Sequence, residues 1–135
     1  MTFTDTHCHL ADPKLADTLP AVLADAQAAG VARFIVPATS PKDWQAVAQL
    51  ERPSENTHIA LGIHPWFSDG LNEAAFQELE SELIRHPQAW VGEIGLDFYG
   101  KEQTQAQRNT QTDVFIRQLI LAQNLNRRVI IHNLK

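Results

Sequence analysis

Residues 89–96 read AWVGEIGL, a short run in which apolar residues follow one another without strict polar alternation. A continuous apolar run of about four to eight residues is typical of a strand buried on both faces, as in a parallel sheet covered by helices. Four other runs rich in β-branched or aromatic residues are FTDTHCHL (3–10), RFIVPAT (33–39), HIALGIHP (58–65) and RVIIH (128–132). The sequence therefore predicts five strands.

The segments between these runs carry the start and stop signals of helices. A proline in the first turn, a serine or asparagine at the cap, or a glycine after the last turn marks several of their ends. The predicted helices cover residues 20–29, a segment that begins at Ser40 and Pro41, residues 73–85 and residues 105–124. In the last of these, Phe115, Leu119 and Ala122 recur at i, i+4 and i+7 and form one broad apolar face together with Ile116 and Ile120, the side that a helix buries.

The alternation of strands and helices along the chain predicts an α/β fold with a parallel sheet. This pattern by itself fits an open doubly wound sheet as well as a (β/α)8 barrel. No break in composition and no low-complexity linker divides residues 1–135, so we expect a single domain. A (β/α)8 barrel takes about 250 residues, and residue 135 comes just after the fifth predicted strand. If the fold is a barrel, we expect it to be incomplete.

The composition excludes several classes of protein. A formal net charge of -5 and a sequence pI of about 5.6 exclude the strongly basic field of a non-specific nucleic-acid binder. Cys8 is the only cysteine, which excludes an internal disulfide framework and favours a reducing compartment. Asp5 and His7 interrupt the N-terminal segment where a secretion signal would be apolar, and no stretch approaches roughly 18 apolar residues. We expect a cytoplasmic protein that does not enter a membrane.

Two histidines, His7 and His9, stand one residue apart at the carboxyl end of the first predicted strand. Side chains alternate in a strand, so both would point the same way from positions about 7 Å apart along the backbone, while Cys8 would point to the opposite face. A histidine in a strand is usually structural, and the pair alone only suggests a metal site. Cys8 is interpreted as a small buried residue against a helix and not as a nucleophile.

Further candidate groups stand at the ends of other predicted strands: His64 in GIHP, Glu93 in VGEIGLD and His132 in VIIHN. The active sites of α/β folds lie at the carboxyl ends of their strands. Buried carboxylates and imidazoles need a compensating ion or a hydrogen-bond network, because an unpaired buried charge is unfavourable. A divalent metal meets this need. Zinc, manganese and magnesium all stay open, and the two oxygens of Glu93 could span two ions.

Four motifs follow one another along the chain: DTHCHL (5–10), GIHP (62–65), GEIGLDFYG (92–100) and VIIHN (129–133). In this order and at these spacings they resemble the TatD family of metal-dependent deoxyribonucleases and hydrolases, which is related to the amidohydrolases. The resemblance runs across the whole chain and corresponds to the N-terminal portion of the family's (β/α)8 barrel. It implies about five parallel strands with four intervening helices here. It also implies hydrolysis of DNA phosphodiester bonds with one or two divalent metal ions.

Carried over residue by residue, the resemblance implies that His7 and His9 bind one metal ion. Glu93 would be a bridging or shared ligand, and His132 would bind the other ion. The family pattern continues with another metal-binding histidine and with an aspartate that is assigned to activating water, and this sequence stops before either. The second ion would then lack a ligand, and we name no catalytic residue.

Three residues near the predicted site have less defined roles. His64 and Asp97 match family positions, and the resemblance implies substrate contact or support of the metal ligands for both. The alternative for Asp97 is a turn-forming residue in the loop that follows it. Trp66, directly after GIHP, either packs a helix on the sheet or flanks a substrate base.

Two other hypotheses for the function remain open. The same fold and metal could hydrolyse an ester or amide of a small molecule, because fold and ligand set do not fix the substrate. The chain could instead be a catalytically inert fragment that associates with a missing C-terminal half or with itself, since an open sheet exposes unpaired edges. For the deoxyribonuclease hypothesis the expected partner is DNA, which the metal ions and not the lysines would contact.

Overall fold

The computed structural model describes residues 1–51, 56–99 and 102–134. Gly100 and Lys135, which end the third motif and the sequence, lie outside these residues. The strands are β1 (Phe3–Asp5), β2 (Val31–Pro37), β3 (Thr57–Leu61), β4 (Trp90–Asp97) and β5 (Val129–Leu134). The α-helices are α1 (Leu19–Ala28), α2 (Trp44–Ala48), α3 (Glu73–Arg85) and α4 (Gln105–Asn124). Short 3₁₀ helices, η1 (Pro13–Leu15) and η3 (Pro65–Phe67), come after β1 and β3.

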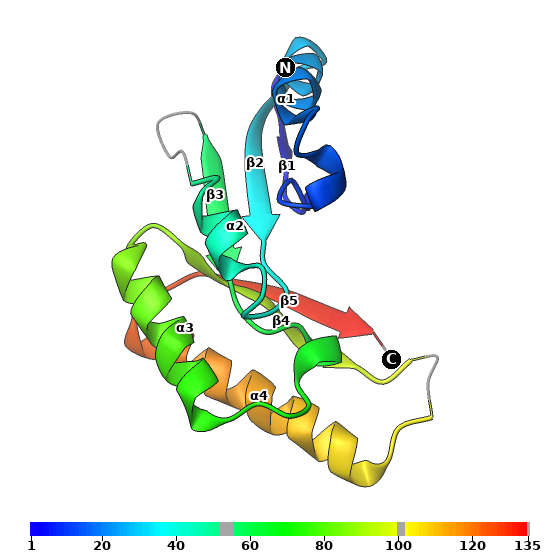
Figure 1. Cartoon of the computed structure of the whole chain (residues 1–135), viewed down its shortest axis with the longest axis vertical. Helices are drawn as coiled ribbons and strands as arrows, with labels where there is room; N and C mark the ends of the chain where they lie inside the picture. The colour runs from blue at the N-terminus through cyan, green and yellow to red at the C-terminus, as the bar shows by residue number, and fades with distance from the viewer. Residues whose placement is uncertain (52–55, 100–101, 135) are drawn as a thin grey trace.

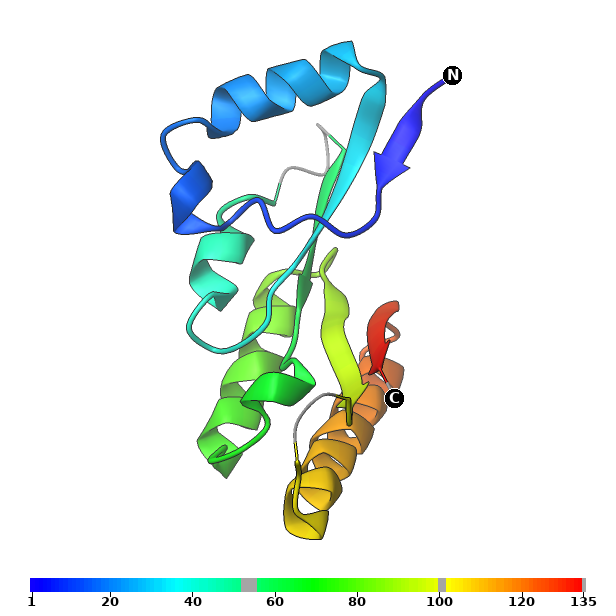
Figure 2. The same ribbon diagram turned by 90° about the vertical axis from the view of Figure 1, so that its right-hand side faces the viewer.

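The five strands form one parallel sheet in which each strand pairs with the next along the chain, in the order β1-β2-β3-β4-β5. The strand direction turns from β2 to β5, so the sheet curls (Figure 1). Helices α1, α2 and α3 lie on one side of the sheet (Figure 2), and α4 packs along β4. The prediction of five parallel strands with four intervening helices is therefore confirmed, and the described residues form a curled half-barrel.

The two central strands are the most buried part of the sheet. Ile59 and Leu61 of β3, together with Val91 and Ile94 of β4, all have 0% of their surface exposed. Helix α3 packs against β3, and it begins where the side chain of Asn72 accepts a hydrogen bond from a main-chain N–H of its first turn. The apolar run at 89–96 is thus buried, as its continuous pattern predicts.

Strand β1 is shorter than the predicted strand 3–10, because the chain turns at its end. The main-chain N–H of His7 donates to the carboxylate of Asp5 (3.1 Å) and not to the neighbouring strand. His7 and His9 consequently lie in the segment after β1, and their side chains are not displayed by a regular strand. Their imidazoles nevertheless meet, since the two Nε2 atoms lie 3.2 Å apart.

Helix α2 begins at Trp44 and not at Ser40 or Pro41, as the cap signal predicts. The carboxylate of Asp43 accepts hydrogen bonds from the main-chain N–H groups of Thr39 (2.9 Å) and Ser40 (3.0 Å). These bonds close a turn ahead of the helix, so the helix starts one residue after the aspartate. A local side-chain bond to the main chain has displaced the predicted start.

Helix α4 buries only part of the predicted apolar face: Ala122 is 3% exposed, and Phe115 and Leu119 are partly buried against the core. Ile116 and Ile120 are 47% and 51% exposed, so their assignment to the buried face is wrong. The buried positions of this helix are Gln111, Val114, Gln118 and Ala122. Two glutamines point inward because their amides bond to main-chain groups at the ends of β3 and β4.

A glycine in β4 allows close contact with β5 beside the site. Gly95 pairs with His132 in the ladder, and it has a positive φ of +147°. A Cβ atom built on Gly95 would lie 1.8 Å from the carbonyl oxygen of His132, far inside contact distance. The absence of a side chain at position 95 therefore fixes where β5 presents His132.

Within residues 1–51, 56–99 and 102–134, no helix combines the length and the apolar composition that crossing a bilayer requires.

Candidate metal centre

Side chains from distant parts of the sequence meet around the carboxylate of Glu93. His7 and His9 follow β1, Glu93 lies within β4, and His132 lies within β5. The carboxylate of Glu93 is almost fully buried, with 6% of the residue exposed. The structure thus brings together the four residues that the motifs single out as metal ligands.

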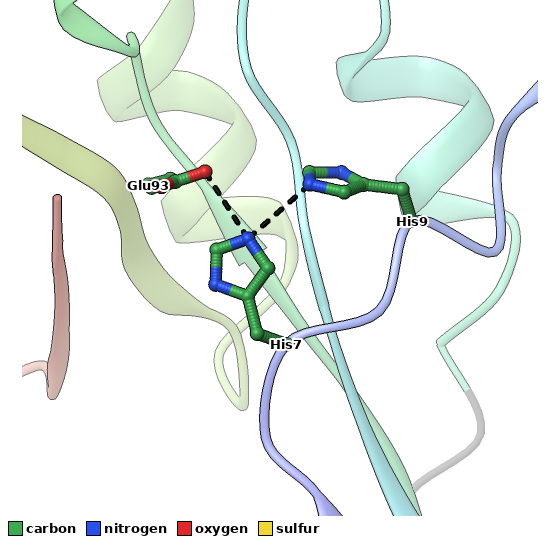
Figure 3. Close-up of side chains that lie close together, drawn as sticks. All are labelled: His7, His9 and Glu93. Carbon is green, nitrogen blue, oxygen red and sulfur yellow. Dashed lines mark hydrogen bonds and ion pairs between the residues drawn. The ribbon is translucent and has the colours of Figure 1, made fainter.

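The first group consists of His7, His9 and Glu93 (Figure 3). The Nε2 atom of His7 lies 3.2 Å from Nε2 of His9 and 3.3 Å from Oε2 of Glu93. Both histidines are exposed while the carboxylate is buried, so the group is open to solvent on the histidine side.

The second group consists of Glu93, His132 and His64. Nδ1 of His132 lies 3.0 Å from Oε1 of Glu93, and Nε2 of His64 lies 3.8 Å from the same oxygen. Each carboxylate oxygen of Glu93 therefore faces a different set of imidazoles, Oε2 toward the first group and Oε1 toward the second.

The first group has donor atoms and spacings that fit a divalent ion. Two ligands that each lie about 2.0–2.2 Å from a tetrahedral ion are roughly 3.3–3.6 Å from each other. The separations of 3.2 Å and 3.3 Å around Nε2 of His7 are close to that edge length. Imidazole nitrogen with carboxylate oxygen is a donor set that first-row divalent ions accept.

His64 differs from the other histidines in the state of its ring. Its Nδ1 accepts a hydrogen bond from the main-chain N–H of Trp66 (3.1 Å), so the neutral ring carries its proton on Nε2. Burial lowers the pKa of His64, with the charge of Glu93 acting in the opposite direction, and the ring is therefore neutral. A protonated Nε2 donates a hydrogen bond and does not coordinate a metal, which leaves Glu93 and His132 as ligand atoms of the second group.

Asp97 is buried (2% exposed) beside His132. Its Oδ2 accepts a hydrogen bond from the indole N–H of Trp66 (2.6 Å) and lies 3.2 Å from Nε2 of His132. Burial acts to raise the pKa of Asp97, but hydrogen bonds from Trp66, from the main chain of Tyr99 and from His132 outweigh burial and lower it. An ionised Asp97 would keep the proton of His132 on Nε2 and leave Nδ1 as the ligand atom.

A family model described as TatD related DNase matches residues 4–135. The chain belongs to the TatD-related DNase family. The YjjV protein of Escherichia coli (strain K12), named as an uncharacterized metal-dependent hydrolase, is 35% identical over 133 residues. That alignment covers 97% of this chain and 50% of YjjV. A TatD protein of Escherichia fergusonii, named as a 3'-5' ssDNA/RNA exonuclease, is 30% identical over 129 residues, which are 95% of this chain and 48% of the relative.

The crystal structure of YjjV matches with a TM-score of 0.88 and 34% identity. It aligns with 98% of this chain and 51% of the YjjV chain. This TatD-family chain therefore spans about half the length of the curated relatives that it matches. The match decides between the two α/β folds that the sequence left open, and the prediction of the N-terminal part of a (β/α)8 barrel is confirmed.

The sequence did not indicate the residues that hold the strand ends of this TatD-family chain in place. Gln111 accepts from the main-chain N–H of Asp97 (2.9 Å) and donates to its carbonyl oxygen (3.2 Å). Gln118 makes the same pair of bonds to Ile63 (2.7 and 3.1 Å), the residue before His64. Two glutamines seven residues apart, and so on one face of the same helix, are the signal that could have found them.

Asp97 makes one contact that fits each of its two sequence interpretations, a turn-forming role and support of a metal ligand. The main-chain N–H of Tyr99 donates to Oδ1 of Asp97 (3.1 Å), which is a turn-forming bond, while Oδ2 faces His132. The buried carboxylate supports His132 from behind. Direct substrate contact by His64 and Asp97 stays a prediction.

Cys8 lies between the two histidines of the first group but takes no part in it. Its thiol donates to the carbonyl oxygen of Ile35 (3.5 Å) on β2. Burial and the negative charge of Asp5 raise the pKa of Cys8 to about 12, against the smaller lowering effect of the bond to Ile35. The thiol is therefore protonated near neutral pH, as expected for a packing residue.

Proposed function

We propose that this chain supplies the metal centre of a divalent-metal-dependent deoxyribonuclease. His7, His9 and Glu93 would hold one ion, and Glu93 with His132 would hold a second. The proposal rests on one observation: the two oxygens of the Glu93 carboxylate face different histidines. Oε2 lies 3.3 Å from Nε2 of His7, and Oε1 lies 3.0 Å from Nδ1 of His132. Membership of the TatD-related DNase family, and the names of the two relatives described above, support a metal-dependent nuclease.

Residues of this chain would have distinct roles in binding the metal ions and the phosphate. A divalent ion, when bound, neutralises phosphate oxygens, orients the substrate and lowers the pKa of a bound water. His7 and His9 present imidazole nitrogens on the open side of the group, where a phosphate can approach. Asp97 holds His132 from behind, and the Nε2–H of His64 is a hydrogen-bond donor within 3.8 Å of Glu93, directed toward the site.

The proposal also covers the identity of the metal, the domain organisation and the cellular compartment. Two imidazoles with one carboxylate suit zinc or manganese better than magnesium, which prefers oxygen ligands. Residues 1–135 would belong to one domain, and the protein would act in the cytoplasm, where the single thiol of Cys8 stays reduced. DNA would be attracted by the bound ions, because the chain itself has a net charge of -5.

A metal titration of the 135-residue chain tests the ligand assignment. Binding of Mn²⁺ or Zn²⁺ is measured by calorimetry for the wild type and for the double variant His7→Ala/His9→Ala. His58→Ala, which changes a histidine near the amino end of β3, is the matched control. We expect the double variant to lose at least about tenfold in affinity and the control to bind like the wild type. Equal affinity of all three proteins would discard the assignment.

Activity is tested on a labelled single-stranded DNA and on small-molecule esters, with added metal or with chelator. We expect DNA cleavage that requires metal and that the double variant lacks. Cleavage that survives chelation rejects the metal-dependent reaction. Metal-dependent hydrolysis of the esters with none of the DNA would favour the small-molecule alternative.

A further inference from the structure

We propose that a nucleobase subsite adjoins the metal centre, in a small cavity walled by Trp66. The inference rests on the proposed nuclease function and names the part of the substrate that this chain would recognise. A base bearing an exocyclic amino group, such as cytosine, is the ligand that the cavity fits. The base would stack on the indole while its phosphate lies at the metal centre.

The cavity lies between η3 and the start of α4 and has a volume of about 190 Å³. Sites for drug-sized ligands measure roughly 300–1,000 Å³, so this cavity holds a single small group. Its lining combines an aromatic wall with amide and carboxylate side chains, from Pro65, Trp66, Ser68, Asp69, Glu102, Gln103, Gln107 and Gln111.

The indole of Trp66 is both accessible and fixed in orientation. It is 64% exposed, an unusual value for a tryptophan, while its N–H donates to the buried carboxylate of Asp97 (2.6 Å). Its ring also meets the ring of His64 edge to face, with centroids 5.0 Å apart. An aromatic face that is held in place before binding stacks on a base at little cost in side-chain entropy.

The polar groups of the cavity select for the edge of a base and against a phosphate. Among the residues that the structure describes, the lining contains no lysine or arginine, whereas Asp69 and Glu102 bring two carboxylates. Each amide of Gln103 and Gln107 uses one of its two N–H groups in the described part of the chain, toward Asp97 O (2.8 Å) and Asp69 (3.5 Å). Carboxylates accept hydrogen bonds from the amino groups of cytosine, adenine and guanine, and thymine has no such group.

The cavity lies close to the candidate metal centre. Oδ2 of Asp97 contacts both Trp66 and His132, so only one side chain separates the aromatic wall from the metal centre. Within a nucleotide, the base and its phosphate are separated by a single sugar. A phosphate at Glu93 and His132 would thus bring its own or the adjacent base to Trp66.

The test compares three probes that are not phosphodiesters and are therefore not consumed: dCMP, dTMP and deoxyribose 5-phosphate. Their affinities for the 135-residue chain are measured by calorimetry, with Mn²⁺ and with chelator. We expect dCMP to bind about 5- to 100-fold more tightly than the sugar phosphate, and more tightly than dTMP. The metal should strengthen binding of all three probes.

Variants separate stacking from the other roles of the tryptophan. Trp66→Ala should remove most of the advantage of dCMP over the sugar phosphate, whereas Trp66→Phe keeps a ring and should retain most of it. Gln107→Glu keeps the acceptor of the α4 capping box and removes the cavity donor, so it should weaken dCMP binding severalfold. Trp90→Phe, at the start of β4, is the matched control and should change nothing.

The outcomes distinguish the two proposals. Metal-dependent binding of the sugar phosphate with no gain from the base overturns the subsite and leaves the metal centre standing. A gain from the base that depends on Trp66 but not on metal keeps the subsite and overturns the metal centre. Equal binding of dCMP and dTMP overturns the assignment of the amino group, and binding unchanged in Trp66→Ala overturns the stacking wall.

Discussion

At the scale of single residues, the carboxylate of Glu93 is the point where the chain's separate motifs meet. It is buried at 6% exposure, and its two oxygens face His7 and His132. A buried carboxylate of this kind requires positive partners, because an uncompensated charge in the interior is strongly unfavourable. Among the described residues, the partners within reach are imidazoles, which are also good metal ligands.

Asp97→Asn tests whether Asp97 orients His132. The amide has nearly the same shape, but it lacks the negative charge of the carboxylate that lies 3.2 Å from Nε2 of His132. We expect the affinity for Mn²⁺ or Zn²⁺ to fall by roughly 10- to 100-fold, as for other residues that support a metal ligand. Calorimetric titration measures this, with Asp113→Asn on the exposed side of α4 as the control. An unchanged affinity would show that Asp97 forms a turn but does not orient His132.

Cys8 should be a poor nucleophile in the folded protein. With a pKa of about 12, its thiolate fraction rises with pH only far above neutrality. Alkylation by iodoacetamide at pH 8 should be about 100-fold slower in the native chain than in urea, and its rate should still be rising at pH 10. Mass spectrometry follows the reaction. A native rate that levels off below pH 9 contradicts the assignment.

At the scale of elements, helix α4 acts as a brace for the strand ends as well as a cover for the sheet. Gln118 has 0% of its surface exposed, and its amide serves both the N–H and the carbonyl oxygen of Ile63. Gln111 does the same for Asp97. Main-chain groups beyond the end of a strand have lost their ladder partners, and these side chains replace them.

Gln118→Leu should be strongly destabilising although it makes the helix face more apolar. It leaves a buried N–H and a buried carbonyl of Ile63 without their partner, at about 1–3 kcal/mol for each such group. Urea unfolding followed by circular dichroism measures the free energy of unfolding. Gln123→Leu, exposed on the same helix, is the control and should change it little. Similar stability of the two variants would show that Gln118 does not brace the strand end.

Gly95→Ala tests the close approach of β4 and β5. The added methyl group would overlap the carbonyl oxygen of His132, so β5 has to move away and take the imidazole with it. We expect a loss of about 3 kcal/mol or more in stability, together with weaker metal binding. Gly70→Ala also has a positive φ (+74°) but open space around it, and should cost only about 1–2 kcal/mol. Equal losses would mean that backbone conformation alone governs both sites.

The features that the sequence predicts correctly are those that interactions between nearby residues determine. Helices 73–85 and 105–124 follow from caps and periodicity within their own residues, and α3 and α4 have these bounds. The end of β1 was not predicted, because the carboxylate of Asp5 accepts a hydrogen bond from the main-chain N–H of His7. The exposure of Ile116 and the burial of Gln118 depend on partners 55 residues away, which periodicity does not detect.

At the candidate site, the motifs identified residues but not their arrangement. The motifs and their predicted strand positions grouped His7, Glu93 and His132, and the structure brings them together, although Glu93 and His132 lie within β4 and β5 and not at their ends. The bond between Trp66 and Asp97 joins side chains 31 positions apart, one in η3 and one at the end of β4. No local pattern encodes such a contact, because it depends on how η3 and the end of β4 pack.

At the scale of the whole molecule, both edges of the sheet are exposed strands. β1 is exposed at all of its residues, and β5 exposes Ile131 (54%) and Leu134 (44%). Unpaired edges with apolar side chains favour pairing with another chain. Among the described residues, β1 and β5 each pair with a strand on one side only, and both edge strands expose apolar side chains.

We predict that the 135-residue chain self-associates through these edges. Sedimentation velocity between micromolar and millimolar concentrations should show a shift toward dimers or larger species. Ile131→Lys with Leu134→Lys should shift the population back toward monomer, because edge lysines oppose strand pairing. Ile84→Lys, at an exposed position on α3, is the control. A monodisperse monomer across the range contradicts this prediction.

The pairing order β1-β2-β3-β4-β5 also bears on how the polypeptide folds while it is made. Every strand has its predecessor as a neighbour, so each newly synthesised βα unit can dock on an edge that has already left the ribosome. Assembly can thus run in the direction of translation, and no early strand has to wait for a late one.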